Sequence, residues 1–218
     1  DWTPMSAASS WAAPVMSRSA SPGVRYVQLT LAAAALTSER PESALPVHDS
    51  MVSVAREWGR APVIAEALTQ RAATALRLGD RTRAEADLNE ARQWLGGLDP
   101  AVRERLEVPV LRVESDLLRP ADPAAAAATA SRALALVQSR RDRLWVAQLS
   151  LRLAKANMAL GRLDEANAAL RAGIQAFDEE RASLQDEGRI SSRDELWQLF
   201  DTATLLADRL DAIAGTMA

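Results

Sequence analysis

One phrase of this chain, Leu-Gly-x4-Ala-x-Ala-x-Leu, occurs twice in the same register, beginning at Leu78 and at Leu160. Such self-similarity at a fixed offset is typical of a helical repeat array. Gly79 and Gly161 each stand where one helix must end in a left-handed corner, which glycine adopts without a Cβ penalty. The alanines that follow allow the next helix to pack closely on its partner. The phrase therefore predicts a stack of helix pairs.

The composition agrees with helices throughout. Ala, Leu, Arg and the acidic residues dominate, whereas aromatic residues make up only 4% of the 218 positions. Hydrophobic residues make up 48%, which is enough for a continuous core. We expect an all-α protein, specifically a right-handed α-solenoid of antiparallel helix pairs with a C-terminal capping helix.

Charge and cysteine content exclude several classes of function. The formal net charge is −3, so no overall positive field attracts nucleic acid. No run approaches the roughly 18 apolar residues of a membrane span. The absence of cysteine excludes a cysteine nucleophile or a cysteine-ligated metal within these residues. Because the chain begins at Asp1, an internal fragment, a processed product and an exported mature form all stay open. We expect a cytoplasmic location, with export as the alternative.

Proline, glycine and small polar residues indicate where the chain divides into segments. Residues 1–23 are rich in Ser, Ala and Pro and predict a flexible lead-in, although Trp2 and Trp11 could instead anchor on a neighbouring surface. Residues 24–60 predict an atypical first pair, with helices at 24–38 and 47–59 separated by a linker from Pro41 to Pro46. Residues 61–187 predict tetratricopeptide-like repeats, and residues 188–218 a capping or linker helix that follows a Ser191–Ser192 N-cap.

The regular pairs are predicted from helical spacing and from Gly, Asp and Pro at the corners. Their helices are expected at 63–78, 82–95, 101–118, 124–139, 143–160 and 163–184. The corners at 79, 121 and 161 are separated by 42 and 40 residues.

The corner phrase resembles the tetratricopeptide repeat. Its steps are filled here by Gly79, Ala84, Leu88 and Ala91 in one unit, and by Gly161, Ala166, Leu170 and Gly173 in the other. The large aromatic residue usual in the first helix is replaced by Ala75 and Asn157. The resemblance implies a solenoid that binds protein or peptide in its concave groove.

A second resemblance begins where the last repeat ends. The runs from Gly173 to Leu184, from Asp186 to Ile190 and from Leu196 to Asp201 are similar to the junction before the peptidase of bacterial CHAT-domain proteins. In that family a repeat array precedes a caspase-like domain with a His and Cys dyad. Because this chain has one histidine and no cysteine, the resemblance implies that any covalently linked peptidase lies outside these residues. No enzymatic activity is assigned to the chain itself.

His48 is the only imidazole, and it lies between Val47 and Asp49 with Ser50 beyond. Consecutive residues at a helix start point in different directions, so they do not form a catalytic triad. Asp49 or Ser50 is expected to be an N-cap. A lone histidine without a second ligand at helical spacing forms no metal site, and no cofactor is indicated.

The candidate binding residues form a column on the first helices of the repeats, spaced about a turn apart. Arginines in a groove could bind carboxylates of a peptide bidentately. The alternative is that they pair with Glu66, Glu114, Asp116 or other acidic neighbours. The column comprises Gln70, Arg77, Arg112, Arg119, Gln148, Arg152 and Lys155.

Tryptophans on the predicted helices, at 58, 94, 145 and 197, are expected to fill interfaces between layers. Trp197, Phe200 and Leu206 of the last helix are expected to leave an apolar face exposed, which is a candidate homodimer interface. The first hypothesis is thus a protein-interaction or regulatory module that belongs to a larger CHAT-type protein. The alternative is a structural or self-assembly scaffold without a groove ligand.

Overall fold

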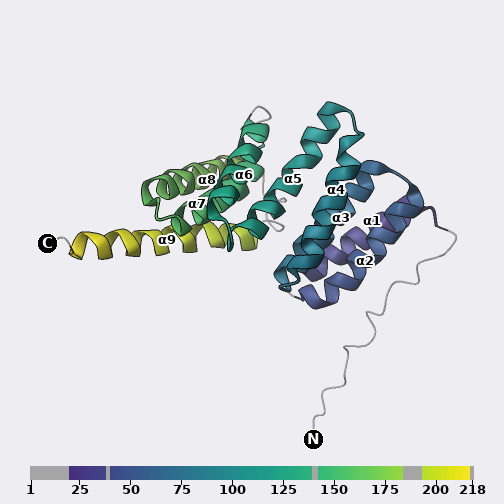
Figure 1. Cartoon of the computed structure of the whole chain (residues 1–218), viewed down its shortest axis with the longest axis horizontal. Coiled ribbons are helices and arrows are strands. Elements are labelled where there is room, and N and C mark those ends of the chain that lie inside the picture. Colours follow the sequence, from purple (N-terminus) through teal and green to yellow (C-terminus); the bar gives the residue numbers. More distant parts are fainter. Residues whose placement is uncertain (1–19, 38–39, 139–141, 184–192, 217–218) are drawn as a thin grey trace, which may run out of the picture.

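The computed structural model describes residues 20–37, 40–138, 142–183 and 193–216, and within these ranges it contains nine α-helices and no β-strand (Figure 1). This confirms the all-α class and is consistent with an α-solenoid. The helices are α1 (Pro22–Thr37), α2 (Pro41–Trp58), α3 (Ala61–Arg77), α4 (Arg81–Gly96), α5 (Pro100–Leu118), α6 (Pro123–Gln138), α7 (Arg143–Ala159), α8 (Leu163–Ser183) and α9 (Arg193–Thr216).

The helices stack in chain order from α1 to α9 (Figure 1). Each helix packs against the next one along the chain. In addition α3 contacts α5, α5 contacts α7, and α7 contacts α9. These contacts between alternate helices form one layer, called here the odd-helix layer (α3, α5, α7 and α9). Such nearest-neighbour packing is typical of repeat arrays.

The two corner glycines adopt the conformation that the repeated phrase predicts. Gly79 has φ 82° and Gly161 has φ 72°. After Gly79, the Asp80 amide donates to the Ala75 carbonyl at 2.9 Å, and after Gly161 the Arg162 amide donates to the Asn157 carbonyl at 2.9 Å. Both are six-to-one bonds of the Schellman type, which satisfy carbonyls at a helix end. The same phrase thus builds the same corner twice.

Small side chains explain how closely the pairs pack. Ala84, Ala91 and Ala166 are completely buried. At Gly173, which stands in register with Ala91, an added Cβ would lie 3.0 Å from the Cβ of Ser150 and 3.1 Å from Cδ2 of Leu199. The glycine therefore lets α8 approach both α7 and α9.

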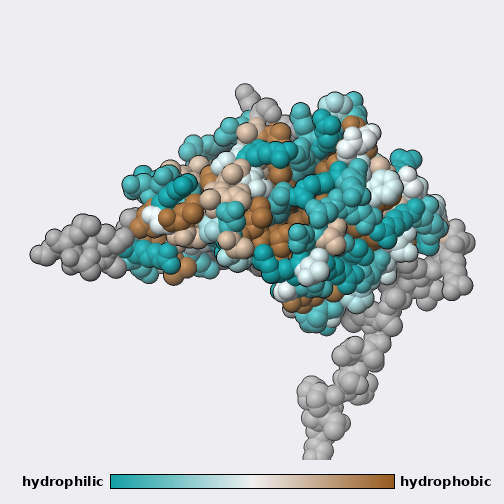
Figure 2. All heavy atoms as spheres, viewed as in Figure 1, coloured by the Kyte–Doolittle hydropathy of each residue, from teal (hydrophilic) through white to brown (hydrophobic). Residues whose placement is uncertain are grey.

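The core is a chain of hydrophobic clusters along the stack. The largest cluster extends from Tyr26 in α1 to Leu117 in α5. A second cluster joins α5, α6 and α7 around Leu111 and Leu149, and a third joins α7, α8 and α9 around Leu151. Since α5 and α7 each contribute to more than one cluster, these helices link the successive clusters. Hydrophilic residues cover most of the face shown in Figure 2.

The start of α2 differs from the prediction. The helix begins at Pro41, where proline is tolerated because first-turn amides have no intrahelical partner, and it continues through Pro46. Ala44 and His48 are buried and hold this stretch against the core. The expected linker from Pro41 to Pro46 is therefore wrong, and so is the expected N-cap at Asp49 or Ser50, which lie inside α2.

The tryptophans have different environments. Trp58 packs against Tyr26 with ring centroids 6.4 Å apart, and Trp145 is partly buried beside the second cluster. Trp94 is 38% exposed, so its expected place in the core is wrong. The side chain of Trp197, the Ser191–Ser192 cap and the lead-in tryptophans lie outside the described residues.

None of the helices that the structure describes is long and apolar enough to cross a membrane.

Candidate functional site

The predicted column falls on three neighbouring helices of the odd-helix layer. Gln70 and Arg77 lie on α3, Gln148 and the cations at 152 and 155 on α7. Arg112 lies on α5 and Arg119 at its C-cap. Since α3 contacts α5 and α5 contacts α7, the structure brings these residues to one layer.

Arg152 joins two helices of the odd-helix layer, α7 and α5. Its side chain is buried, and Nε donates to Oδ2 of Asp116 on α5 at 3.0 Å. Nη1 donates to the carbonyl of Gln148 at 2.9 Å. The internal pairing that the sequence left as an alternative is therefore realised at this position.

Arg112, Lys155 and Gln70 also contact neighbours, whereas Nε of Arg119 is buried without a hydrogen-bond partner among the described residues. The guanidinium of Arg112 lies 5.8 Å from the ring centroid of Trp145, which is within cation–π range. Lys155 donates from Nζ to Oε1 of Gln198 at 2.9 Å, so α7 is tied to α9. Gln70 donates to Oε1 of Glu66 at 3.1 Å, and Arg77 is exposed at the end of α3. The column is thus a set of polar links along the layer as well as a surface.

The observed apolar face of α9 differs from the prediction. Leu206 is only 2% exposed and belongs to the cluster that joins α7, α8 and α9. Leu199, one turn before Ala203, is buried with it. Phe200 is 42% exposed. Leu206 is therefore a packing residue of the chain itself, because the buried stripe of α9 faces α7 and α8.

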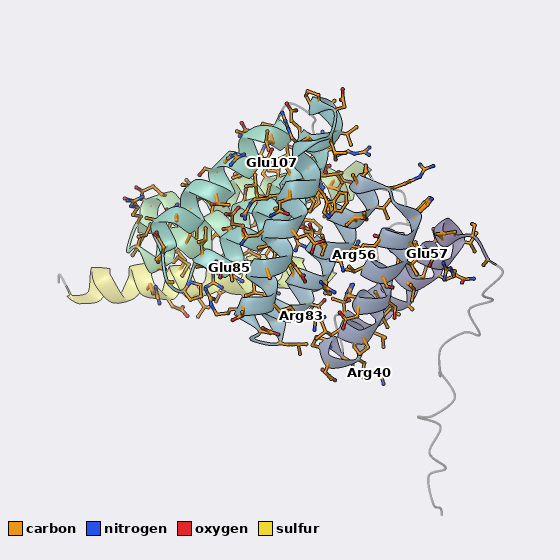
Figure 3. All side chains as sticks on the ribbon, turned by 45° about the vertical axis from the view of Figure 1, so that its right-hand side comes forward. Arg40, Arg56, Glu57, Arg83, Glu85 and Glu107 are labelled. Carbon is orange, nitrogen blue, oxygen red and sulfur yellow. The ribbon has the colours of Figure 1, made fainter. Side chains whose placement is uncertain are left out.

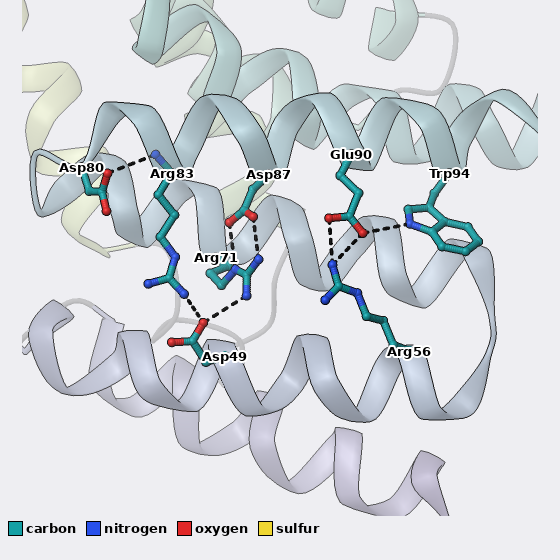
Figure 4. Close-up of polar contacts among 8 residues, drawn as sticks. All are labelled: Asp49, Arg56, Arg71, Asp80, Arg83, Asp87, Glu90 and Trp94. Carbon is teal, nitrogen blue, oxygen red and sulfur yellow. Dashed lines mark hydrogen bonds and ion pairs between the residues drawn. The ribbon is translucent and has the colours of Figure 1, made fainter.

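Sequence reasoning missed a charged network on the face of α2, α3 and α4 (Figure 4). Arg71 of α3 donates to Asp87 of α4 through two parallel bonds, Nε to Oδ2 at 2.8 Å and Nη2 to Oδ1 at 2.6 Å. Its Nη1 donates to Oδ1 of Asp49 on α2 at 3.0 Å. Arg83 of α4 pairs with the same Asp49. We call these four residues the Arg71 network.

Burial makes the centre of this network strong. The side chains of Arg71 and Asp87 are 14% and 5% exposed, and the fork geometry satisfies both carboxylate oxygens. The hydrogen bond to Asp87 raises the pKa of Arg71 above its usual range. Beside it, Arg56 of α2 donates to both oxygens of Glu90 at 2.7 and 2.8 Å. Together the two groups of charges join α2 to α4 across α3.

His48 lies next to the network but does not form a catalytic arrangement. Nε2 is 3.4 Å from Oγ1 of Thr37, while Nδ1 is buried without a hydrogen-bond partner in the part of the chain that the structure describes. Burial lowers the pKa of His48 to about 4, with Asp49 acting to raise it and Arg71 to lower it further. The imidazole is therefore neutral near pH 7. Within the described ranges no three His, Asp or Glu side chains converge as metal ligands.

The repeat register contains a signal for the Arg71 network. At the offset that superposes Gly79 on Gly161, Arg71 corresponds to Leu153 and Asp87 to Ala169. Charged residues thus stand where the other copy of the phrase has apolar ones. A charge at a core position of a repeat is stable only when it is paired, so this mismatch identifies two residues that require partners.

Comparison with known proteins adds no family to these observations. No protein-family model matches the sequence, and the search of curated proteins found no match. The resemblances to the tetratricopeptide repeat and to the CHAT junction stay predictions from the residues that carry them.

Proposed function

We propose that the chain is a protein-interaction module, a right-handed solenoid of antiparallel, tetratricopeptide-like helix pairs that holds a peptide or protein along the odd-helix layer. The observation that supports the proposal is the contact of α3 with α5 and of α5 with α7, since it sets the three helices that carry the column residues side by side. Extended surfaces of this kind are what repeat arrays use for binding. The CHAT-like junction makes a regulatory role beside a linked peptidase part of the same proposal.

The proposal does not depend on unengaged arginines. Arg152 is paired and buried, so its guanidinium supports the layer. Polar groups that can be approached from solvent, such as the partly buried Gln70 and Gln148 and the exposed Arg77, carry the recognition instead. This distinction decides which positions are informative in an experiment.

Site-specific photo-crosslinking tests the binding role. A benzoylphenylalanine is placed at Gln148 of α7, and as a matched control at the exposed Glu85 of α4 (labelled in Figure 3). We expect one adduct with a discrete mass in extracts of the source cells from position 148 and none from position 85. Identical adduct patterns at the two positions, or no adduct at either, would contradict the proposal.

A self-assembly scaffold is the second candidate, and one observation favours it. Val24, Val27 and Leu31 lie along one side of α1 and are 50%, 57% and 68% exposed. An apolar stripe at the end of a solenoid is a typical assembly surface. We expect Leu31→Glu to lower the molar mass measured by light scattering if this candidate is correct. Phe200→Glu examines the homodimer through α9 in the same way.

A further inference from the structure

A cleft opens over α5 between two of its neighbours. Both α4 and α6 pack against α5, and together the three helices line a cavity of ≈ 390 Å³, called here the α5 cleft. Leu95, Val110 and Leu111 line it as parts of the core, with exposures of 4%, 2% and 3%. Because these residues are fixed by packing, the shape of the cleft is present before any ligand arrives.

Basic residues predominate around the cleft. Arg92 of α4, Arg103 of α5 and Arg132 of α6 line it, against one carboxylate, that of Glu107 (labelled in Figure 3). The three guanidinium groups thus come from three different helices. A low-polarity floor beside them strengthens attraction to a negative charge, since the effective dielectric constant is below that of water.

The three arginines differ in how far they are already engaged. Arg132 pairs with Glu107, and Arg92 pairs with Glu114 of α5. Arg103 is exposed and forms no ion pair with any residue that the structure describes. A guanidinium has five N–H donors, so even the paired arginines keep donors for a second acceptor. The cleft therefore has more positive charge than its own carboxylates neutralise.

We propose that the α5 cleft binds an acidic peptide segment, in which one carboxylate is held by Arg103 and a second by Arg92 or Arg132. None of the residues that line the cleft belongs to the predicted column, so the inference goes beyond the function proposed above. The volume lies near the lower end of ligand pockets, which fits a few residues of a chain and excludes a folded domain. Since the molecule is acidic overall, recognition depends on bidentate geometry within the cleft and not on long-range attraction.

Calorimetric titration with a defined probe tests the proposal. The probe is the capped peptide acetyl-Gly-Asp-Leu-Asp-Gly-amide, and the matched control is the same peptide with asparagine at both aspartates. We expect the aspartate peptide to bind with a Kd below about 1 mM and the asparagine peptide to bind at least about tenfold more weakly, because charge-assisted bonds are lost. Inorganic phosphate is expected to compete with the aspartate peptide.

The variant Arg103→Gln removes the guanidinium that has no ion pair, so the fold is expected to be unchanged, and its thermal midpoint verifies this. We expect the variant to bind the aspartate peptide about tenfold more weakly. Arg162→Gln is the matched control, because Arg162 is an exposed arginine in the α7–α8 corner away from the cleft. Equal binding of both peptides, equal losses in the two variants, or binding of phosphate but not of the peptide would each overturn the inference.

Discussion

Replacement of Arg71 by methionine removes the cation of a buried fork and keeps a side chain of similar length. The partner Asp87 is 5% exposed, so its carboxylate would remain in the core of the α2–α4 face without the two bonds that now satisfy it. Asp49 is 43% exposed and keeps both water and Arg83, so it adds little to the cost. The destabilisation therefore comes almost entirely from one stranded carboxylate.

Breaking a buried ion pair from one side costs about 3–5 kcal/mol. Arg71 is 14% exposed, which admits some water, so we expect about 3 kcal/mol from urea unfolding followed by circular dichroism. The double variant Arg71→Met/Asp87→Leu is expected within about 1 kcal/mol of the parent, because no charge is then stranded. Arg56→Met breaks a pair whose side chains are 50% and 32% exposed, and it is the surface control with an expected cost below about 1 kcal/mol.

Two results would refute this reasoning. The first is a loss below about 1 kcal/mol for Arg71→Met, which would mean that Asp87 is hydrated or repartnered. The second is a double variant no more stable than the single one, since the cycle would then show no coupling between the two side chains.

Three further predictions concern other parts of the fold. Gly79→Ala, at φ 82°, is expected to cost about 1 kcal/mol, whereas Gly97→Ala, at φ −92°, is expected to cost nothing, and equal midpoints in urea would contradict the corner argument. The pKa of His48 is about 4 in the folded protein and 6.5 in the unfolded chain, so the unfolded chain takes up the proton first as the pH falls. The free energy of unfolding is therefore expected to decrease by up to about 3 kcal/mol between pH 6.5 and pH 4. His48→Gln should flatten that part of the melting profile, and an unchanged slope would show that another group is responsible. Leu206→Ala, at 2% exposure, is expected to cost about 2–4 kcal/mol and Phe200→Ala, at 42%, less than about 1 kcal/mol, so equal losses in chemical unfolding would contradict the packing of α9.

Much of the fold could be predicted because its determinants are local. A glycine that ends a helix and an aspartate that begins the next act over a few residues, as at Gly79 and Asp80, where the carboxylate accepts the amide of Arg83 at 3.0 Å. The helical periods between such corners give the expected elements within a few residues of their observed bounds. The start of α2 was missed because proline is ambiguous: Pro41 begins a helix, Pro46 is tolerated inside it, and only the burial of Ala44 and His48 decides.

The sequence predicted which helices carry the candidate site residues, but not whether their side chains are paired or exposed to solvent. Helical spacing places Arg112 and Arg152 on neighbouring helices, yet whether a guanidinium faces solvent depends on a residue far away in sequence. Arg152 meets Asp116 at a separation of 36 residues, and Arg71 meets Asp87 at 16 and Asp49 at 22. Pairings of this kind require the packed stack, because no local pattern specifies which residue of the adjacent helix stands opposite.

This dependence changes how charge reversals on the odd-helix layer are interpreted. From the sequence alone, Arg152→Glu is expected to abolish partner binding without loss of stability. In the structure the same change sets a buried glutamate against Asp116 and removes the guanidinium bond to the Gln148 carbonyl, so it is expected to destabilise the contact between α5 and α7. Loss of binding in that variant would then report unfolding of the layer. Positions such as the partly buried, uncharged Gln148 for the layer and the exposed Arg103 for the α5 cleft separate recognition from stability, because their substitution strands no buried charge.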